Sequence, residues 1–594
     1  MRRDVLLALL IWPLFAAEPE IKEFSIVIDK PQTQYTVEVG GTINPENLEI
    51  TIENVGETAV VNPRMTINGL YDWYDVKSIV AEVTRDCKTD QERAMALWWW
   101  VLYKRFQLSP TDRSALHPVR AMNGYGYGIC GHTSAWMKCL WTAAGLKARV
   151  QEIWGHTVSE AYWDGAWRML DGNVKVFYLD RDNRTIASLA TLERDKGLIQ
   201  RGIHPRDPWF RQPDPPSRND EFVRYLVSYK DNYEEDSYDS EIAKDYTMAM
   251  TLKPGEKLVR WWDPRLGKFE GRSTRSKPPE RYANGQLIWE PDLQRIDIRP
   301  YLSVPKWGNL ATRAQDGRTP AIHVADLQDR LYTRPSVFTI PIASPYPILG
   351  GRFSCTLVKE GSSSSDLVSM FFGQPGWRPG DLLNLSGEAA AKAVDLDLDA
   401  RISRAGVLYQ YGIGFAIRGN AETKPPAQAG LDGFRSVSDL QVSPHSLPAL
   451  TLGRNTVRFW SSFSGAAKVR ITHRWREIAG RRPPTKIDAP ASPGDGEQAA
   501  TLTPTLKWTP ATDPDPSDKV ADYQVMMSLR PDCRWPLSPT LHQNVGSDKA
   551  EWTVPASFLN PGTAYYWKVR ARDNRGDIGE WSRVFRFRTA NNAQ

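Results

Sequence analysis

A glycine-rich approach leads directly into an apolar helical run, and this junction constrains the fold more than any other feature of the chain. The approach is Gly124-Tyr125-Gly126-Tyr127-Gly128-Ile129, and the run Gly131 to Ala144 predicts a buried helix with Cys130 at its start. Unpaired N–H groups and the partial positive charge of a helix N-terminus can lower a cysteine pKa from about 8.5 to roughly 3.5–7.5. Cys130 is therefore a candidate nucleophile.

A predicted β-hairpin downstream carries a histidine and an aspartate. The Asp-Gly pair at 164–165 stands between two strand-like runs and indicates a two-residue turn. If the turn pairs Trp163 with Ala166, Asp171 lies one diagonal step from His156 on the same face. A carboxylate that holds an imidazole fixes the tautomer needed to take up and return a proton. We therefore expect His156 and Asp171 to meet.

In this order Cys130, His156 and Asp171 predict a Cys-His-Asp relay, and the segment resembles a known family. The glycine-rich loop, the cysteine helix, and the histidine and aspartate around a hairpin are similar to the bacterial transglutaminase-like (papain-like cysteine) superfamily, over about residues 70 to 200. The resemblance implies an α+β core that acts on amide bonds, although some members have lost catalysis. Cys130 would be the nucleophile, His156 the general base and acid, and Asp171 the orienting carboxylate.

Two positions depart from the family pattern. Members often carry an aromatic residue two positions after the histidine, where this chain has Val158. No upstream side chain is assigned as the donor that stabilises a tetrahedral oxyanion; Asn123, Tyr125 and Tyr127 are the candidates. The alternative is therefore that Cys130, His156 and Asp171 have a structural role and do not catalyse a reaction.

Two further residues near Cys130 have structural interpretations. His132 does not share a helix face with Cys130, because residues two apart point in different directions. Cys139 has the spacing of a core residue. A zinc site built from Cys130, His132, Cys139 and His156 lacks the paired close spacing of structural zinc sites. We expect neither a metal nor a cofactor.

The N-terminus indicates export. An apolar run from Val5 to Ala17 follows two arginines, which is typical of a secretory signal peptide and short for a membrane span. We expect cleavage after Ala17, no membrane span thereafter and an extracytoplasmic location; an uncleaved anchor is the alternative. The five cysteines are too few and scattered for a disulfide framework, and their odd number leaves a free thiol.

The length of 594 residues predicts several domains. The expected class is multidomain α+β and all-β, in which a transglutaminase-like core is flanked by β-sandwich modules. The expected boundaries are 1–17 for the signal peptide, 18–69 for a small β module, 70–235 for the core, 236–480 for one or two β-sandwiches, 481–498 for a linker and 499–594 for a terminal domain.

The terminal domain resembles a fibronectin type III module. Tyr565-Tyr566-Trp567-Lys568-Val569 and the later Trp581-Ser582 recur at positions usual for such modules. These domains space or bind more often than they catalyse. The tripeptide Arg575-Gly576-Asp577 spells an integrin-type motif, which we interpret as turn chemistry.

The charge pattern limits the partners. A formal net charge of +5, with acids and bases interspersed, gives no reason to expect nucleic acid. We expect instead a peptide or protein amide as substrate, with cell-wall or glycan-associated substrates included. The alternative is a non-catalytic extracellular protein that binds glycans or surfaces through a transglutaminase-like scaffold. The sequence indicates no oligomeric state and does not separate hydrolysis from transamidation.

Overall fold

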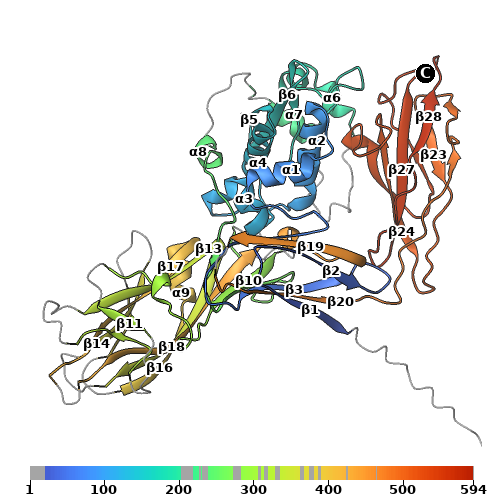
Figure 1. Ribbon diagram of the computed structural model, residues 1–594. Helices are drawn as coiled ribbons and strands as arrows, with labels where there is room; N and C mark the ends of the chain where they lie inside the picture. The colour runs from blue at the N-terminus through green and yellow to red at the C-terminus, as the bar shows by residue number, and fades with distance from the viewer. Residues whose placement is uncertain are drawn as a thin grey trace, which may run out of the picture.

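The computed structural model contains five sheets and one helical region (Figure 1). It describes residues 20–202, 219–226, 229, 238–271, 282–305, 309–312, 319–327, 335–360, 367–373, 380–385, 390–422, 426–462 and 465–592. The expected signal peptide at 1–17 lies outside the described residues. Strands predominate, and β-sandwich modules make up much of the chain, as predicted.

The first β-sandwich is assembled from both ends of the chain. β1 (Ile21–Ile28) and β3 (Glu46–Asn54) flank β20 (Val469–Arg476), whereas β2 (Gln32–Val39) and β4 (Val60–Ile67) flank β19 (Gly453–Ser462). Alternate residues of β2 are buried, which gives each strand one face toward the core. The segment 18–69 therefore shares its sheets with residues 453–476. A period of two predicts the strands but not these distant partners.

The helical region is inserted between two neighbouring strands of this sandwich. The chain leaves at β4 and returns at β8 (Thr251–Leu252), where Val60 pairs with Leu252. The inserted elements are α1 (Val76–Thr84), α2 (Asp90–Lys104), α3 (Pro118–Arg120), α4 (Cys130–Ala143), β5 (Lys147–Ile153), β6 (His156–Trp163), β7 (Ala166–Met169), α5 (Leu189–Arg194), α6 (Gly197–Gln200), α7 (Asn219–Tyr225) and α8 (Asp239–Ile242). Figure 1 shows them gathered above the first sandwich.

Local sequence signals explain where the central helices begin. Thr89 caps α2 by accepting a hydrogen bond from the Glu92 N–H (3.2 Å), as the Thr-x-x-Glu spacing predicts. The indole N–H of Trp141 on α4 donates to the Ala94 carbonyl on α2 (3.1 Å), so the two helices are joined by a buried polar contact as well as by packing. α4 is buried along almost its whole length and forms the centre of the helical region.

The central part of the chain extends the large sheet. β9 (Glu256–Trp261), β10 (Ala283–Trp289) and β18 (Ala429–Val442) follow β3 in order. Beyond them lie β11 (Leu310–Thr312), β12 (Ile322–Val324), β13 (Ser336–Lys359), β14 (Leu367–Gly373), β15 (Gly380–Leu385), β16 (Ala390–Asp397), α9 (Asp399–Ala405) and β17 (Leu408–Arg418). β13 pairs with β17 along its first half and with β16 and β18 along its second. One long strand thus joins the central sheet to its distal end.

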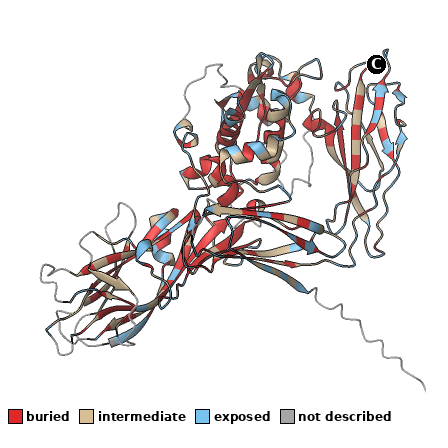
Figure 2. Ribbon diagram, viewed as in Figure 1, coloured by how far each residue is buried: buried red, intermediate tan, exposed pale blue. Residues whose placement is uncertain are grey.

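The C-terminal region is a β-sandwich of two facing sheets. One sheet contains β21 (Pro490–Ser492), β23 (Thr505–Trp508) and β26 (Glu551–Thr553), and the other β22 (Gln498–Ala499), β24 (Val520–Ser528), β25 (His542–Gly546), β27 (Ala564–Asp573) and β28 (Phe585–Thr589). Trp508, Tyr523 and Trp567 form its buried aromatic centre. Figure 2 shows the alternation of buried and other residues along β27 and β28. The expected linker 481–498 contributes β21 and the start of β22.

This sandwich packs against the helical region. Arg530 forms an ion pair with Glu92 of α2 (2.6 Å), and the rings of Trp99 and His542 lie 5.5 Å apart. The two regions also share one cluster of buried apolar residues. Among the described residues, no helix has the length and apolar character needed to cross a lipid bilayer.

Candidate active site around Cys130

Cys130 is the first residue of α4, and the glycine-rich approach explains how it gets there. Gly126 has a φ of 70°, a left-handed conformation that ends the preceding helical turn. A Cβ on Gly128 would lie 2.4 Å from the ring of Trp136, so this position has no room for a side chain. No side chain caps the helix at Ile129. Backbone N–H groups of the first turn are therefore available to the half-buried Cys130 thiol.

The hairpin has the predicted register. Trp163 pairs with Ala166, and Asp164 and Gly165 both have positive φ (48° and 75°), as a type I′ turn requires. The ladder continues to a hydrogen bond from the Leu170 N–H to the Ser159 carbonyl (3.1 Å). Asp171 is thereby brought to the face of β6 that carries His156. The hairpin prediction is confirmed.

His156 and Asp171 form a short buried pair. His156 Nε2 lies 2.7 Å from Asp171 Oδ2, and the two residues are 7% and 1% exposed. The other carboxylate oxygen of Asp171 accepts from the N–H groups of Asn173 (2.7 Å) and Val174 (2.9 Å). The indole of Trp98 donates to the Asp171 carbonyl (3.0 Å). The turn that follows Asp171 and the Trp98 side chain of α2 therefore fix Asp171 independently of its contact with the imidazole.

The Cys130 thiol completes this constellation. His156 and the backbone N–H groups of Thr157 and Gly131 are the neighbours that lower the pKa of this thiol. Because Nε2 faces Asp171, Nδ1 is the ring nitrogen left for the thiol. The structure therefore brings the three predicted residues together in one connected arrangement.

The electrostatics favour a thiolate–imidazolium pair. Burial opposes ionisation of Cys130, but the hydrogen bond and positive charge of His156, with the two backbone N–H groups, bring the pKa of the thiol below its ordinary value. Burial also opposes protonation of His156, but Asp171 and Cys130 outweigh it and raise the pKa of the imidazole to about 10. In contrast, burial raises the pKa values of Cys139, Cys355 and Cys533 to about 12. Cys130 differs from these thiols in its partners.

Aromatic side chains of α7 cover the histidine. The Tyr225 ring lies 4.9 Å from the His156 ring with an interplanar angle of 31°, and Phe222 makes an edge contact at 6.3 Å. The Tyr225 carbonyl accepts from the Trp154 N–H (3.0 Å), which ties α7 to the start of the hairpin. Val158, where the family often has an aromatic residue, is fully buried in the same apolar cluster as Phe222 and Tyr225. Sequence reasoning missed α7, because its short helix shows no signal that connects it to His156.

Arg105 connects the nucleophile loop to the aspartate turn, which sequence reasoning also missed. The side chain is buried; its Nε donates to the Gly172 carbonyl (3.0 Å) and its Nη1 to the Gly128 carbonyl (3.3 Å). The other guanidinium nitrogen donates to the Asn173 carbonyl. Gly128 precedes Cys130 by two residues, whereas Gly172 and Asn173 directly follow Asp171. One planar guanidinium thus sets the separation of two parts of the site.

The three side chains considered for the oxyanion have other partners. The Asn123 amide donates to the carbonyls of Trp73 (2.8 Å) and Val119 (3.0 Å). The Tyr125 hydroxyl donates to Asp112 (2.8 Å), and the Tyr127 hydroxyl donates to the Glu270 carbonyl. All three are buried in the packing beneath the glycine-rich approach. We therefore correct this expectation: these groups hold the loop, and the donors beside Cys130 are backbone N–H groups.

His132 and Cys139 occupy structural positions on α4. His132 packs edge-on against Trp136 at 6.3 Å, and burial lowers the pKa of its imidazole to about 4. The Cys139 thiol donates to the Ile242 carbonyl (3.9 Å). All five cysteines are free thiols.

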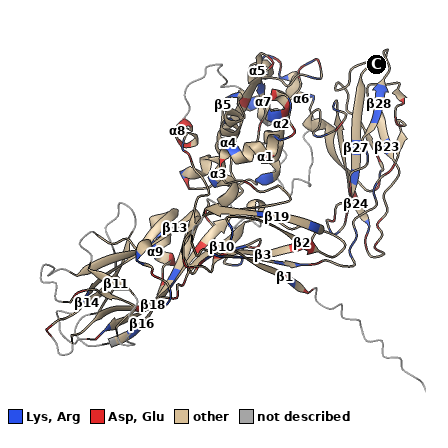
Figure 3. Ribbon diagram, viewed as in Figure 1, with Lys and Arg blue, Asp and Glu red and all other residues tan. Residues whose placement is uncertain are grey.

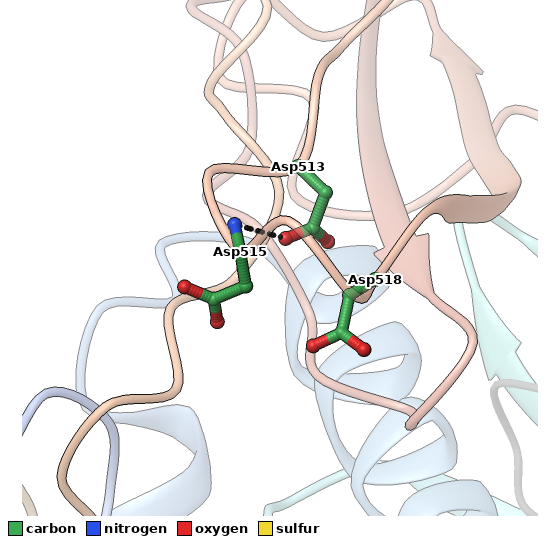
Figure 4. A group of neighbouring side chains, drawn as sticks. All are labelled: Asp513, Asp515 and Asp518. Atoms are coloured by element: carbon green, nitrogen blue, oxygen red, sulfur yellow. Dashed lines mark hydrogen bonds between the residues drawn. The ribbon is translucent and has the colours of Figure 1, made fainter. Parts of the chain in front are cut away.

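Three aspartates form an acidic group in the C-terminal sandwich (Figure 4), and two of them pair with arginines, whereas Asp513 accepts from the Asp515 N–H (2.9 Å). The group is Asp513, Asp515 and Asp518. Arg482 pairs with Asp515 (3.0 Å), and Arg575 pairs with Asp518 (2.8 Å). Their carboxylates are thus engaged in ion pairs.

The integrin-type tripeptide takes part in the same network. Arg575 is its first residue, and Asp577, its last, pairs with Arg481 (2.6 Å). Both charged ends of the tripeptide are bound within the protein, in agreement with turn chemistry.

Comparison with known proteins identifies the class of one region. Residues 496–592 match the family described as Rha78A-like, N-terminal immunoglobulin domain. Together with its two facing sheets, this match establishes an immunoglobulin- or fibronectin III-like β-sandwich at the C-terminus. No curated protein matches the chain.

Solved structures give only distant likenesses. The fibronectin domains FN1–FN3 of chicken CNTN1 are 11% identical with a TM-score of 0.14, over 42% of this chain and 65% of that one. The β-1,2-glucanase of Parabacteroides distasonis is 11% identical (TM-score 0.13, 51% and 35%), and so is the Endo-D glycoside hydrolase domain of Streptococcus pneumoniae R6 (0.12, 42% and 33%). The chain spans less than two thirds of each. At such TM-scores the likenesses carry no argument about function.

Proposed function

We propose that the protein is a transglutaminase-like cysteine enzyme that cleaves or exchanges amide bonds. The observation that carries this proposal is the chain of contacts from the half-buried Cys130 thiol through His156 to the buried Asp171 carboxylate. A nucleophile, a base within hydrogen-bond reach and a group that orients the base are the three parts that covalent acyl transfer requires. The helix and three-stranded sheet that hold them fit the α+β core implied by the family resemblance.

The first half-reaction forms a thioester. The Cys130 thiolate attacks the carbonyl carbon of an amide, and the carbonyl oxygen becomes an oxyanion. The first-turn N–H groups of α4, which lack a side-chain cap at Ile129, are the donors nearest to that charge. His156, protonated through its link to Asp171, donates its proton to the departing amine as the C–N bond breaks. An acyl-enzyme and a free amine result.

The second half-reaction releases the acyl group. His156, now neutral, takes a proton from water or from a second amine, and the resulting nucleophile attacks the thioester carbonyl. The C–S bond breaks, the Cys130 thiolate is regenerated and His156 is again protonated. Water gives a carboxylic acid, whereas an amine gives a new amide. Asp171 keeps the imidazole oriented and balances its positive charge.

The access of water to His156 affects the choice between hydrolysis and transamidation. Tyr225 and Phe222 pack against the imidazole, and the pair with Asp171 is almost inaccessible to solvent, so bulk water has little access to the base. Amide-bearing peptides or proteins outside the cytoplasm are the proposed substrates, since the N-terminal apolar run is typical of an exported protein.

A comparison of product profiles tests the proposal. The reduced full-length protein would be incubated, with a chelator present, with a mixed library of peptides and cell-wall peptides, and mass spectrometry would record new termini and new cross-links. Cys130→Ala should lower product formation by at least about 10³-fold, as removal of a catalytic nucleophile does in comparable relays. Cys139→Ala is the matched control on the same helix. Equal products from wild type and Cys130→Ala would contradict the proposal and leave the non-catalytic scaffold.

A further inference from the structure

A large groove lies between α1 and the sheet of β2, β19 and β4, away from Cys130. Its volume is about 1030 Å³, and its walls come from the exposed side of α1 and from neighbouring strands of the first sandwich. Pockets for single small ligands usually measure about 300–1,000 Å³. The α1 groove, defined here by Lys77, Arg85, Gln34, Arg458 and Trp460, is thus large enough for a polymer segment.

Three basic side chains line the groove without acidic partners. Lys77 lies in the first turn of α1, Arg85 directly follows its last residue, and Arg458 of β19 lines the same groove. Within the part of the chain that the structure describes, none of the three forms an ion pair, although other basic residues in the molecule often do. Figure 3 colours basic residues blue on α1 and β19. The groove therefore presents positive charge that the protein itself does not neutralise.

The two carboxylates in the groove are already satisfied. Asp72 accepts a hydrogen bond from Arg64 Nη2 at 2.6 Å, which makes a local ion pair. Glu82 accepts from the Trp73 indole (3.2 Å) and from the Asp72 N–H (2.9 Å). In the described part of the chain, neither carboxylate forms an ion pair with Lys77 or Arg85. The uncompensated charge is consequently positive.

The spacing of the charges favours an extended ligand. Lys77 and Arg85 are eight positions apart, which corresponds to about 12 Å along a helix. At this spacing the two side chains can bind two separate anionic groups of one ligand. A polymer that carries negative groups at intervals can meet Lys77, Arg85 and Arg458 in turn.

The remaining lining side chains match sugar hydroxyls and rings. Trp460 is half-buried with one side against Arg64, whose Cζ lies 5.3 Å from the ring centroid, and the ring lines the groove. Gln34 accepts a hydrogen bond from Arg458 (3.1 Å), which orients its amide on the groove wall. Amide and hydroxyl groups both donate and accept hydrogen bonds, as sugar hydroxyls do, and an aromatic ring can cover the apolar face of a sugar.

We propose that the α1 groove binds an acidic polysaccharide, a sugar polymer that carries carboxylate or sulfate groups. This site is separate from Cys130 and does not depend on the proposed catalysis. It gives the protein a way to remain on an anionic glycan while another part of the chain acts. An acidic peptide would use the same charges but not the hydroxyl-matching wall, and single-stranded nucleic acid would need more than one stacking ring.

Calorimetric titration of the full chain tests this site with defined polymers. Polygalacturonate carries carboxylates, dextran sulfate carries sulfates, and dextran is neutral; oligo(dT) and polyglutamate represent the other polyanions. We expect binding to one or both acidic polysaccharides that weakens as salt is added, and none to dextran. The tighter of the two acidic polymers identifies the preferred charged group. Equal binding of dextran, or tighter binding of polyglutamate or oligo(dT), would overturn the proposal.

Variants locate the binding on the groove. The double variant Lys77→Gln/Arg85→Gln should weaken polysaccharide binding by about tenfold or more, because two charge contacts are lost. Trp460→Leu should weaken it by about threefold through loss of the aromatic face. Arg404→Gln, an exposed arginine on α9, is the matched control, and Cys130→Ala should bind like the wild type. Unchanged binding by the double variant, with an unchanged melting temperature, would exclude this groove as the site.

Discussion

Ionisable side chains gather both around Cys130 and in the acidic loop at 513–518, but the two regions differ in how those side chains are exposed and paired. At Cys130, one member of the set is half exposed and its partners are arranged behind it in a line. In the loop, Asp515 and Asp518 are each paired with an arginine. Proximity of charged groups is therefore not sufficient for a site. In the first region, Cys130 remains partly exposed, while His156 and Asp171 are buried and bound to each other beside it.

The two regions also differ in how they are held. Asp171 is fixed by main-chain N–H groups and by Trp98, and Arg105 ties its turn to the loop before Cys130. The acidic loop is held by the long-range pairs of Arg482 and Arg575, whose side chains are 55% and 44% exposed. Buried main-chain contacts set geometry more strictly than partly exposed ion pairs. The predictions below test this difference.

The largest effect is expected for Asp171→Asn. The amide cannot balance the imidazolium and can favour the wrong tautomer of His156, so kcat should fall by about 10³–10⁴-fold. The change also moves the alkaline limb of the pH profile. In the wild type the protonated His156 persists until the pH rises through about 10, and without the Asp171 charge its pKa falls, so activity is lost at lower pH.

Steady-state rates across pH check both parts of this prediction. Asp195→Asn, an exposed carboxylate paired with Arg181 in the same region, is the matched control and should leave the profile unchanged. Near-normal turnover of Asp171→Asn would show that Asp171 does not orient the base.

Thiol labelling should separate Cys130 from the buried cysteines. Near neutral pH, a thiol with a pKa about 12 is almost entirely protonated, and such a thiol should react with iodoacetamide on the order of 10³-fold more slowly than Cys130. Limited labelling followed by peptide mapping gives the order of reaction. Faster modification of Cys355 or Cys533 than of Cys130 would remove the distinction between the two kinds of cysteine environment.

The contrast also shows what could be predicted from sequence. The Asp-Gly turn sets a register, and the alternation of strand faces then brings Asp171 to His156 without further information. The helix start at Cys130 follows from the glycines before it. These are local rules, and they act over the short stretch in which the site is built.

Long-range arrangements could not be predicted in this way. β1 and β3 pair with β20, which lies more than 400 residues later in the chain. A hydrophobic period of two predicts a strand but does not predict which other strand it pairs with. Arg105 and Tyr225 reach the site through tertiary packing, as do the partners that occupy Asn123 and Tyr127. The three residues of the candidate site were therefore accessible to sequence reasoning, whereas most of those that hold them in place were not.

Substitution of Arg105 should give an intermediate effect. Arg105→Met removes the hydrogen bonds that the guanidinium donates to the Gly128 and Gly172 carbonyls. The loop before Cys130 and the turn after Asp171 can then move apart, so kcat should fall by roughly 10- to 100-fold. Arg105→Lys should recover part of this loss. Because Arg105 touches backbone and not substrate, we expect KM to change little.

A split between kcat and KM identifies a positioning role. Arg93→Met on the surface of α2 is the matched control for loss of an arginine. A higher KM with unchanged kcat would place Arg105 in substrate binding instead.

The smallest effect is expected in the acidic loop, where the comparison predicts an ion-pair network rather than a cation site. Asp518 is 3% exposed at its side chain, and its partner Arg575 also donates to Ser517 (3.0 Å). Because that arginine is partly exposed, Asp518→Asn should lower the stability of the sandwich by no more than about 1 kcal/mol. Thermal melting of the full chain measures this, with the exposed Asp548→Asn as the matched control.

A calcium site would instead bind the ion in the native state alone and raise the melting temperature of the wild type. We expect calcium to leave that temperature unchanged, since two of the three carboxylates that would coordinate it, those of Asp515 and Asp518, are held by Arg482 and Arg575. A calcium-dependent rise that Asp518→Asn abolishes would show that the arginines are displaced and that the loop binds a cation.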